Sequence, residues 1–166
     1  MSSSGASLSK YLPIYLNDHL MGSTTGVELV KRIAKQHMGS ELGTFCSTLT
    51  QEIEADRDDL LDIMATLDAS PNQPKVAIGW IVEKVGRLKL NGELLAHSPL
   101  STVVELEGLS MGIEGKRSLW VALAETEAVA ARVGPDRLRT LIERAEQQRE
   151  GVERHRHEAA RRAFTA

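Results

Sequence analysis

Apolar residues recur at three- and four-residue steps through four long segments of this chain, over residues 13–38, 41–67, 99–132 and 136–163. This spacing places the apolar side chains on one face of an α-helix, so each segment is predicted to be a long amphipathic helix. No stretch shows the alternation expected of a strand, and aromatic residues make up only 4% of the chain. We therefore predict an all-α fold.

The breaks between the segments carry residues that stop and start helices. Gly39 is suited to end the first helix and Ser40 to cap the second, while Ser98 and Pro99 form a cap followed by proline in the first turn. Gly134 and the proline after it separate the last two helices. Because the break at Gly39 is so short, we expect the first two helices to be antiparallel. A shorter helix is predicted over residues 74–91, in the connection between the two pairs.

Together these elements predict a four-helix bundle made of two antiparallel helix hairpins, with the short helix in the long crossover. The length of 166 residues fits one domain. We expect residues 1–10 to form a flexible, Ser-rich N-terminus and residues 11–166 to form a single helical bundle domain.

Composition excludes several functional classes. Apolar residues make up 42% of the chain, enough for a core, and the net charge of −3 gives no strong attraction to nucleic acid. The single cysteine, Cys46, excludes an internal disulfide. No uncharged apolar run reaches the roughly 18 residues of a membrane helix, and no secretory signal is visible. We expect a soluble cytoplasmic protein that binds neither membrane nor nucleic acid.

Polar residues interrupt the apolar faces of three helices. Asp56 lies on the apolar stripe of the second helix, with Glu52 at its edge. In the third helix Glu107 and Glu114 flank Met111, on the face that also carries Val104, Ser118 and Val121. His155 and Gln148 lie along the stripe of the fourth helix, and Glu146, Glu150, Glu153 and His157 form a second row there.

Two interpretations fit these polar residues, because a buried charge needs a partner. They can pair with inward Arg or Lys, or they can bind two iron or manganese ions, as carboxylates and histidines do inside some helix bundles. Such bundles place a His three residues after a Glu, and neither Glu52 nor Glu146 has one there. The candidate metal ligands are Glu52, Asp56, Glu107, Glu114, Glu146, His155 and His157.

Acidic residues and glycines are unusually placed as well. The second helix holds seven acids and one base between Gln51 and Asp68, and the arginines of the fourth helix are the expected partners. Five glycines lie within predicted helices, where each costs about 1 kcal/mol relative to Ala. They indicate a close backbone approach, either between helices, in a homodimer contact or to a ligand. They are Gly22, Gly26, Gly108, Gly112 and Gly115.

The layout over residues 12–163 resembles the ferritin-like superfamily. The segments NDHLMGS (residues 17–23) and EGLSMGIEGKRSLW (residues 107–120) are similar to bacterial members of that group. The resemblance implies one carboxylate from each helix and a His from two of them. The positions it suggests are Asp18 or Glu28, Glu52 or Asp56, Glu107 or Glu114, and Glu146 or Glu150 with His155 or His157. The missing Glu-to-His spacing departs from that pattern.

The sequence therefore predicts a non-catalytic, homodimeric, ferritin-like bundle without its di-metal site, acting as a binding or scaffold protein without a cofactor. The alternative is an iron- or manganese-dependent oxidase or iron-handling protein with an atypical carboxylate-rich site. A third interpretation is a helical adaptor for another protein. The sequence identifies neither a small ligand nor a protein partner.

Overall fold

The computed structural model describes residues 8–72 and 98–165. These residues form five helices and no strand, which confirms the all-α prediction for the part of the chain described. The helices are α1 (Tyr11–Gln36), α2 (Glu41–Thr66), α4 (Pro99–Ala124), α5 (Glu127–Val133) and α6 (Pro135–Thr165). The predicted helix over 74–91 falls outside the described residues, and so do residues 1–7 of the predicted N-terminus.

The helix ends follow the predicted signals. Ser40 caps α2 by accepting a hydrogen bond from the Gly43 N–H at 3.1 Å, and Ser98 caps α4 by accepting one from the Ser101 N–H at 3.2 Å. Gly39 and Gly134 have φ of 82° and 101°, in the left-handed region where glycine is favoured. These caps and turns confirm the breaks after α1 and before α4 and α6.

One boundary is wrong: the helix predicted over 99–132 is two helices. Helix α4 ends at Ala124, and the chain becomes extended at Thr126 before α5 begins. The Thr126 hydroxyl donates to the Ala122 carbonyl at 2.8 Å, the local side-chain bonding that competes with helix continuation. The turn directs Val129 into the core, where it is 1% exposed, and this burial favours the break.

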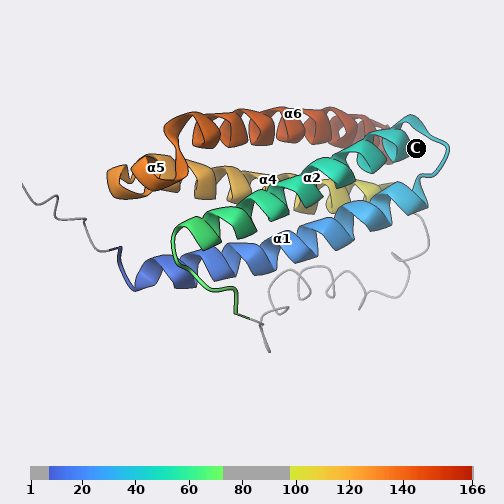
Figure 1. Ribbon diagram of the computed structural model, residues 1–166. Helices are drawn as coiled ribbons and strands as arrows, with labels where there is room; N and C mark the ends of the chain where they lie inside the picture. The colour runs from blue at the N-terminus through green and yellow to red at the C-terminus, as the bar shows by residue number, and fades with distance from the viewer. Residues whose placement is uncertain (1–7, 73–97, 166) are drawn as a thin grey trace, which may run out of the picture.

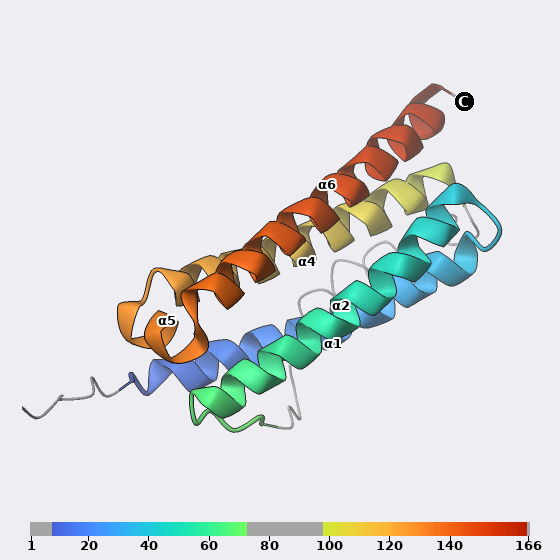
Figure 2. The same cartoon turned by 45° about the horizontal axis from the view of Figure 1, so that its top comes forward.

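The helices form two hairpins that lie side by side (Figures 1 and 2). Helices α1 and α2 run antiparallel along most of their lengths, and α4 and α6 do the same, with α5 at the turn between them. The hairpins meet where α1 lies against α4, whereas the backbones of α2 and α6 approach at few positions. Helix α4 begins at the end of the molecule opposite to the one where α2 finishes.

Apolar side chains from all five helices fill the core. Leu16, Val30 and Ile33 of α1 pack in one cluster with the α2 stripe and the inner faces of α4 and α6. The predicted stripes of α1, α2 and α6 are largely confirmed. The buried core residues of α2 and α6 include Cys46, Leu49, Ile53, Leu60, Ile63, Leu138, Leu141, Ala145 and Val152.

The predicted inner face of α4 is wrong. The face with Val104, Met111 and Ser118 is half-buried or exposed, and Met111 is 44% exposed. The buried residues are instead Val103, Leu106, Leu109, Ser110, Ile113, Leu119, Trp120 and Leu123. Helix α4 is apolar on several sides, so its sequence pattern does not define a single inward face.

No helix among the described residues is long and apolar enough to cross a membrane.

Candidate functional site

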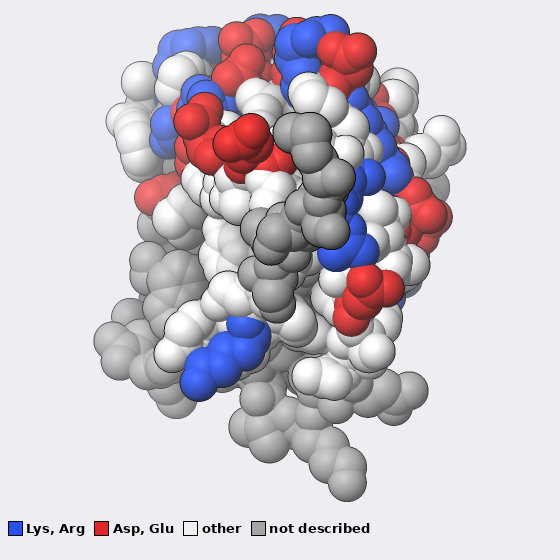
Figure 3. All heavy atoms as spheres, turned by 60° about the vertical axis from the view of Figure 1, so that its left-hand side comes forward, with Lys and Arg blue, Asp and Glu red and all other residues white. Residues whose placement is uncertain are grey.

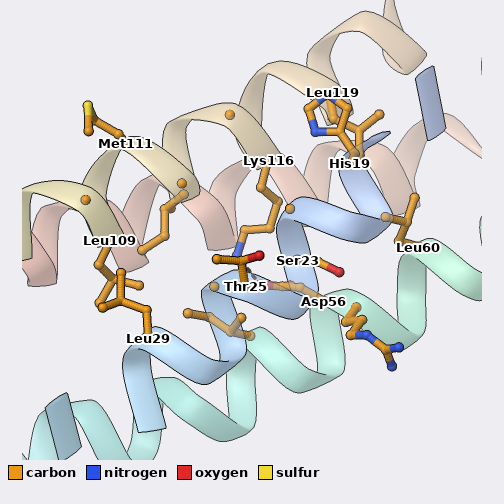
Figure 4. A pocket seen from close by; sticks show the side chains of 18 of the residues that line it. His19, Ser23, Thr25, Leu29, Asp56, Leu60, Leu109, Met111, Lys116 and Leu119 are labelled. Carbon is orange, nitrogen blue, oxygen red and sulfur yellow. Dashed lines mark hydrogen bonds and ion pairs between the residues drawn. The ribbon is translucent and has the colours of Figure 1, made fainter. Parts of the chain in front are cut away.

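A cavity of about 540 Å³ lies between α1 and α4, with several residues of α2 on its inner side. Its walls include Leu29 of α1, Ile53 and Leu60 of α2, and Leu109 and Leu119 of α4. Figure 4 shows Leu29 and Leu109 extending toward each other from α1 and α4, while Lys116 reaches from α4 across the space between the helices. Ligand pockets typically measure about 300–1,000 Å³, so this cavity has the size of a small-molecule site.

Every glycine of α1 and α4 lines this cavity. These glycines are Gly22, Gly26, Gly108, Gly112 and Gly115. For Gly22, Gly26, Gly112 and Gly115, no described atom lies within 4 Å of the position that a Cβ would take. Gly108 would meet only the Leu29 Cδ2 atom, at 3.7 Å. Among the described residues, four of the five glycines therefore show no close contact with a facing helix, and the homodimer and ligand interpretations stay open.

Most hydroxyl groups on the α1 wall are already bonded within the helix. Ser23 donates to the Leu20 carbonyl at 2.6 Å, and Thr25 donates to the Met21 carbonyl at 3.5 Å. Hydroxyls bonded to their own helix in this way present carbon rather than free polar groups to their surroundings. The α1 wall is therefore less polar than its sequence indicates.

One buried polar cluster lies at the inner side of the cavity. Asp56 of α2 is 2% exposed and forms ion pairs with Lys116 of α4 and Arg144 of α6. Gln148 of α6, 3% exposed, donates to Asp56 at 3.0 Å and accepts from Lys116. These contacts give the carboxylate the partners that a buried charge requires, and they link three helices.

The same pairing continues toward the α5 end of the molecule. Asp59 accepts from Arg137 at 2.9 Å and from Arg144 at 2.6 Å, and Asp62 accepts from Arg137 at 2.7 Å. Figure 3, seen from the side on which α5 lies, shows acidic and basic atoms intermixed at this end. The predicted pairing of the acid-rich second helix with arginines of the last helix is confirmed, and it occurs within one chain.

Burial sets the protonation behaviour of the groups around the cavity. It lowers the pKa of Lys116 below its ordinary value, and the charge of Asp56 opposes that shift. Burial also lowers the pKa of His19 at the α1 rim, against the opposing charge of Asp18. The His19 ring meets Tyr15 edge-on, with the ring centroids 4.6 Å apart. The His19 imidazole at this rim therefore loses its proton more readily than a solvent-exposed histidine does.

Two of the predicted metal ligands, Asp56 and Glu107, line the cavity. Asp56 is ion-paired as described above, and Glu107 is exposed at the α4 rim. Glu52 lies half-buried on α2, one turn before Asp56. The inward-facing position predicted for Glu107 is wrong, because α4 turns a different face to the core.

The remaining predicted ligands lie away from the cavity. Glu114 and Glu146 both contact Arg117, at 3.3 and 2.9 Å. His155 stacks on Phe45 with ring centroids 4.5 Å apart, and His157 is an exposed residue beside Glu153. The predicted set of seven is therefore spread over several places instead of converging on one centre.

Among residues 8–72 and 98–165, no group of three or more His, Cys, Asp or Glu side chains is arranged to hold a metal ion. The carboxylates nearest the middle of the helices are engaged with Arg and Lys instead. Iron or manganese would be bound by carboxylate and imidazole groups. In the described residues these groups contact separate partners and do not converge on one point.

Sequence reasoning did not identify Lys116 and Trp120 as site residues. The buried Asp56 implies a cation on a facing helix, but the pattern of α4 does not say which of its residues faces inward. Trp120 is 1% exposed. It also lines the cavity, and its Nε1–H has no acceptor among the described residues.

These features define an all-helical protein with a small-molecule-sized cavity between two of its helices. In comparisons with known proteins, no family model matches the chain, and no match was found among curated proteins or solved structures. The cavity and its chemistry are therefore the basis for a functional proposal.

Proposed function

We propose that this protein binds a small, largely apolar molecule in the cavity between α1 and α4, as a non-catalytic binding protein. The observation that carries this proposal is the position of the glycines. All five glycines of α1 and α4 line one cavity of about 540 Å³, and at four of them no atom of the described residues lies within 4 Å of the position of a Cβ.

The energetic cost of the glycines supports a ligand. Each glycine destabilises its helix by about 1 kcal/mol relative to Ala, and the described structure shows no packing contact that offsets this at four positions. A molecule lying against the bare backbone recovers van der Waals contact that a methyl group would prevent. Glycine at these positions therefore keeps the cavity wide, and it makes the two helices less stable.

We further propose that the two hairpins belong to a ferritin-like four-helix bundle with one long crossover. The directions of the helices support this, because α2 and α4 run the same way and α4 begins at the end of the molecule opposite to the one where α2 finishes. Binding iron or manganese would require the carboxylates to leave their Arg and Lys partners. We also propose that the protein is a homodimer. Light scattering during gel filtration would measure its molar mass in solution.

The proposal is tested by adding a side chain to the cavity wall. Gly112→Leu projects four carbons into open space beside α4, so we expect it to fold and to weaken binding of Nile red at least tenfold. Nile red is an uncharged dye whose fluorescence rises in apolar surroundings, and its titration gives the dissociation constant.

Ser118→Leu is the matched control, because Ser118 is an exposed residue of the same helix that does not line the cavity. It should leave the dye affinity unchanged within about twofold. Equal affinity in the wild type, Gly112→Leu and Ser118→Leu would place the dye elsewhere and would refute the cavity as the binding site. Absence of dye binding in the wild type would also count against the proposal.

A further inference from the structure

The cavity between α1 and α4 is long compared with its volume. Its described lining extends from Tyr15 to Leu29 along α1 and from Val104 to Trp120 along α4. Because an α-helix rises about 1.5 Å per residue, these two stretches are about 21 and 24 Å long. A sphere with the cavity's volume of about 540 Å³ would be only about half as wide. The cavity is therefore elongated, with its long axis along the two helices.

The two walls of the cavity also match in register. Helices α1 and α4 run antiparallel, and the Leu29 Cδ2 atom lies 3.7 Å from the position that a Gly108 Cβ would take. Residues before Leu29 on α1 therefore face residues after Gly108 on α4, in order along the cavity. Figure 4 shows Leu29 and Leu109 near one end and His19 and Leu119 near the other.

The groups on the inner side of the cavity suit a hydrocarbon. Ile53 and Leu60 of α2 lie there, and Lys116 lies between the two ends, where its ammonium group pairs with Asp56 and Gln148. Since that charge has its partners, the methylene groups of the Lys116 side chain are what it offers to a neighbouring apolar molecule. A hydrocarbon can therefore pass the ion pair without disturbing it.

We propose that the ligand is an unbranched hydrocarbon chain with an uncharged polar group at one end, lying extended along α1 and α4. This inference rests on the proposed function and adds the chemical class of the ligand. An extended chain advances about 1.2 Å for each backbone bond, so the cavity accommodates roughly 16 carbons. Tyr15 is 38% exposed and Asp18 is also exposed, so the polar group meets water at their end of the cavity.

The test measures how affinity depends on chain length, with straight-chain primary alcohols from octanol to icosanol. Equilibrium dialysis, with each alcohol quantified by gas chromatography, gives the dissociation constants for the wild type. We expect the affinity to rise about threefold to fourfold for each added methylene, the effect of burying that group in an apolar site. The rise should end near 16 carbons, where the chain fills the length of the cavity.

A variant places a block at the middle of the cavity. Gly112 lies midway between Val104 and Trp120 on α4, so Gly112→Leu should leave room for only half of the chain. We expect it to weaken the binding of hexadecanol about tenfold or more and that of octanol less than about twofold. Ser118→Leu, outside the cavity on the same helix, is the control and should change neither affinity.

The outcomes separate this inference from the proposed function. If Nile red and octanol bind the wild type but the affinity stops rising by about twelve carbons, the cavity is a binding site and the extended chain is wrong. A rise that continues unchanged to icosanol, or equal weakening of octanol and hexadecanol in Gly112→Leu, would also contradict the extended chain. If neither Nile red nor any alcohol binds the wild type, the proposed function fails and this inference fails with it.

Discussion

Asp56, 2% exposed, ties α2 to Lys116 of α4 and to Arg144 of α6. Its place on the apolar stripe of the second helix predicted burial and a cationic partner, and both are confirmed. The identity of one partner, Lys116, could not be predicted, because α4 is apolar on several sides and its inward face is chosen only by packing. The need for a partner follows from the position of Asp56 in the apolar stripe, whereas the tertiary fold determines which residue meets that need.

We predict that Asp56→Asn destabilises the protein by about 3 kcal/mol, since it leaves Lys116 and Arg144 facing each other without a carboxylate. Lys116→Met should cost less, under about 2 kcal/mol, because Asp56 keeps Arg144 and Gln148 as partners. Urea unfolding monitored by circular dichroism measures both. A larger loss of stability in Lys116→Met than in Asp56→Asn would contradict the view that Asp56 is the central residue of this cluster.

Cys46 of α2 has a free thiol and is 0% exposed. Burial raises the pKa of its thiol to about 12, so the reactive thiolate is scarce near neutral pH. We expect iodoacetamide at about pH 8 to label the folded protein far more slowly than the protein unfolded in guanidinium. Labelling of the folded protein at the rate of a free thiol would show that Cys46 is accessible.

At the scale of the helices, the boundaries were predicted well wherever a cap or a glycine marks them. Ser40, Ser98 and Gly134 are examples in which the local chemistry is sufficient. The break at Thr126 is not predictable from sequence because its local signal, a hydroxyl bonded to the carbonyl four residues earlier, also occurs at Ser47 and Thr50 inside α2 without a break. The burial of Val129 favours the turn, and that contact exists only in the folded molecule.

Replacing a helix glycine with alanine should have opposite effects on stability at Gly112 and at Gly43. Gly112→Ala should stabilise the protein without ligand by about 0.5–1 kcal/mol, because the added methyl group meets no described atom within 4 Å and favours the helix. Gly43→Ala should destabilise it by about 1–3 kcal/mol, because its Cβ would overlap the His37 carbonyl in the α1–α2 turn.

Thermal unfolding of the two glycine variants checks these values. Destabilisation by Gly112→Ala would indicate that this part of the α4 surface is closely packed, contrary to the open cavity. Unchanged stability in Gly43→Ala would contradict the tight backbone approach at the start of α2.

At the scale of the whole molecule, ion pairs join helices whose backbones approach at few positions. Asp59 is partly buried, which alone would raise its pKa, but the hydrogen bonds from Arg137 and Arg144 prevail and lower it. On α6, the hydrogen bond from Arg156 lowers the pKa of Glu153 to about 2, with a further contribution from Ser110 of α4. Such depressed carboxyl pKa values stabilise the fold only while the groups are ionised.

We therefore predict that the free energy of unfolding falls as pH decreases from about 4.5 to about 2, the ordinary and the shifted pKa of Glu153. The sign follows because the unfolded chain takes up protons first in this range. Glu153→Gln should flatten this dependence, and Glu150→Gln, which changes an exposed carboxylate of the same helix, is the control. Urea unfolding at several pH values measures the effect, and identical slopes in the wild type and Glu153→Gln would contradict it.

The arrangement of the hairpins could be anticipated from the short break at Gly39 and the long connection after α2. The cavity could not, because it depends on the rotation of α4 and on the distance between α1 and α4. The five glycines were the visible signal, and one of the interpretations considered for them was approach to a ligand. The open space beside four of them favours that interpretation.

The most direct test of the central claim is a crystal structure of the full chain soaked with Nile red. We expect electron density for the dye between α1 and α4, against Gly22, Gly26 and Gly112. Density for the protein's own side chains filling that space, or the dye bound only elsewhere, would contradict the claim.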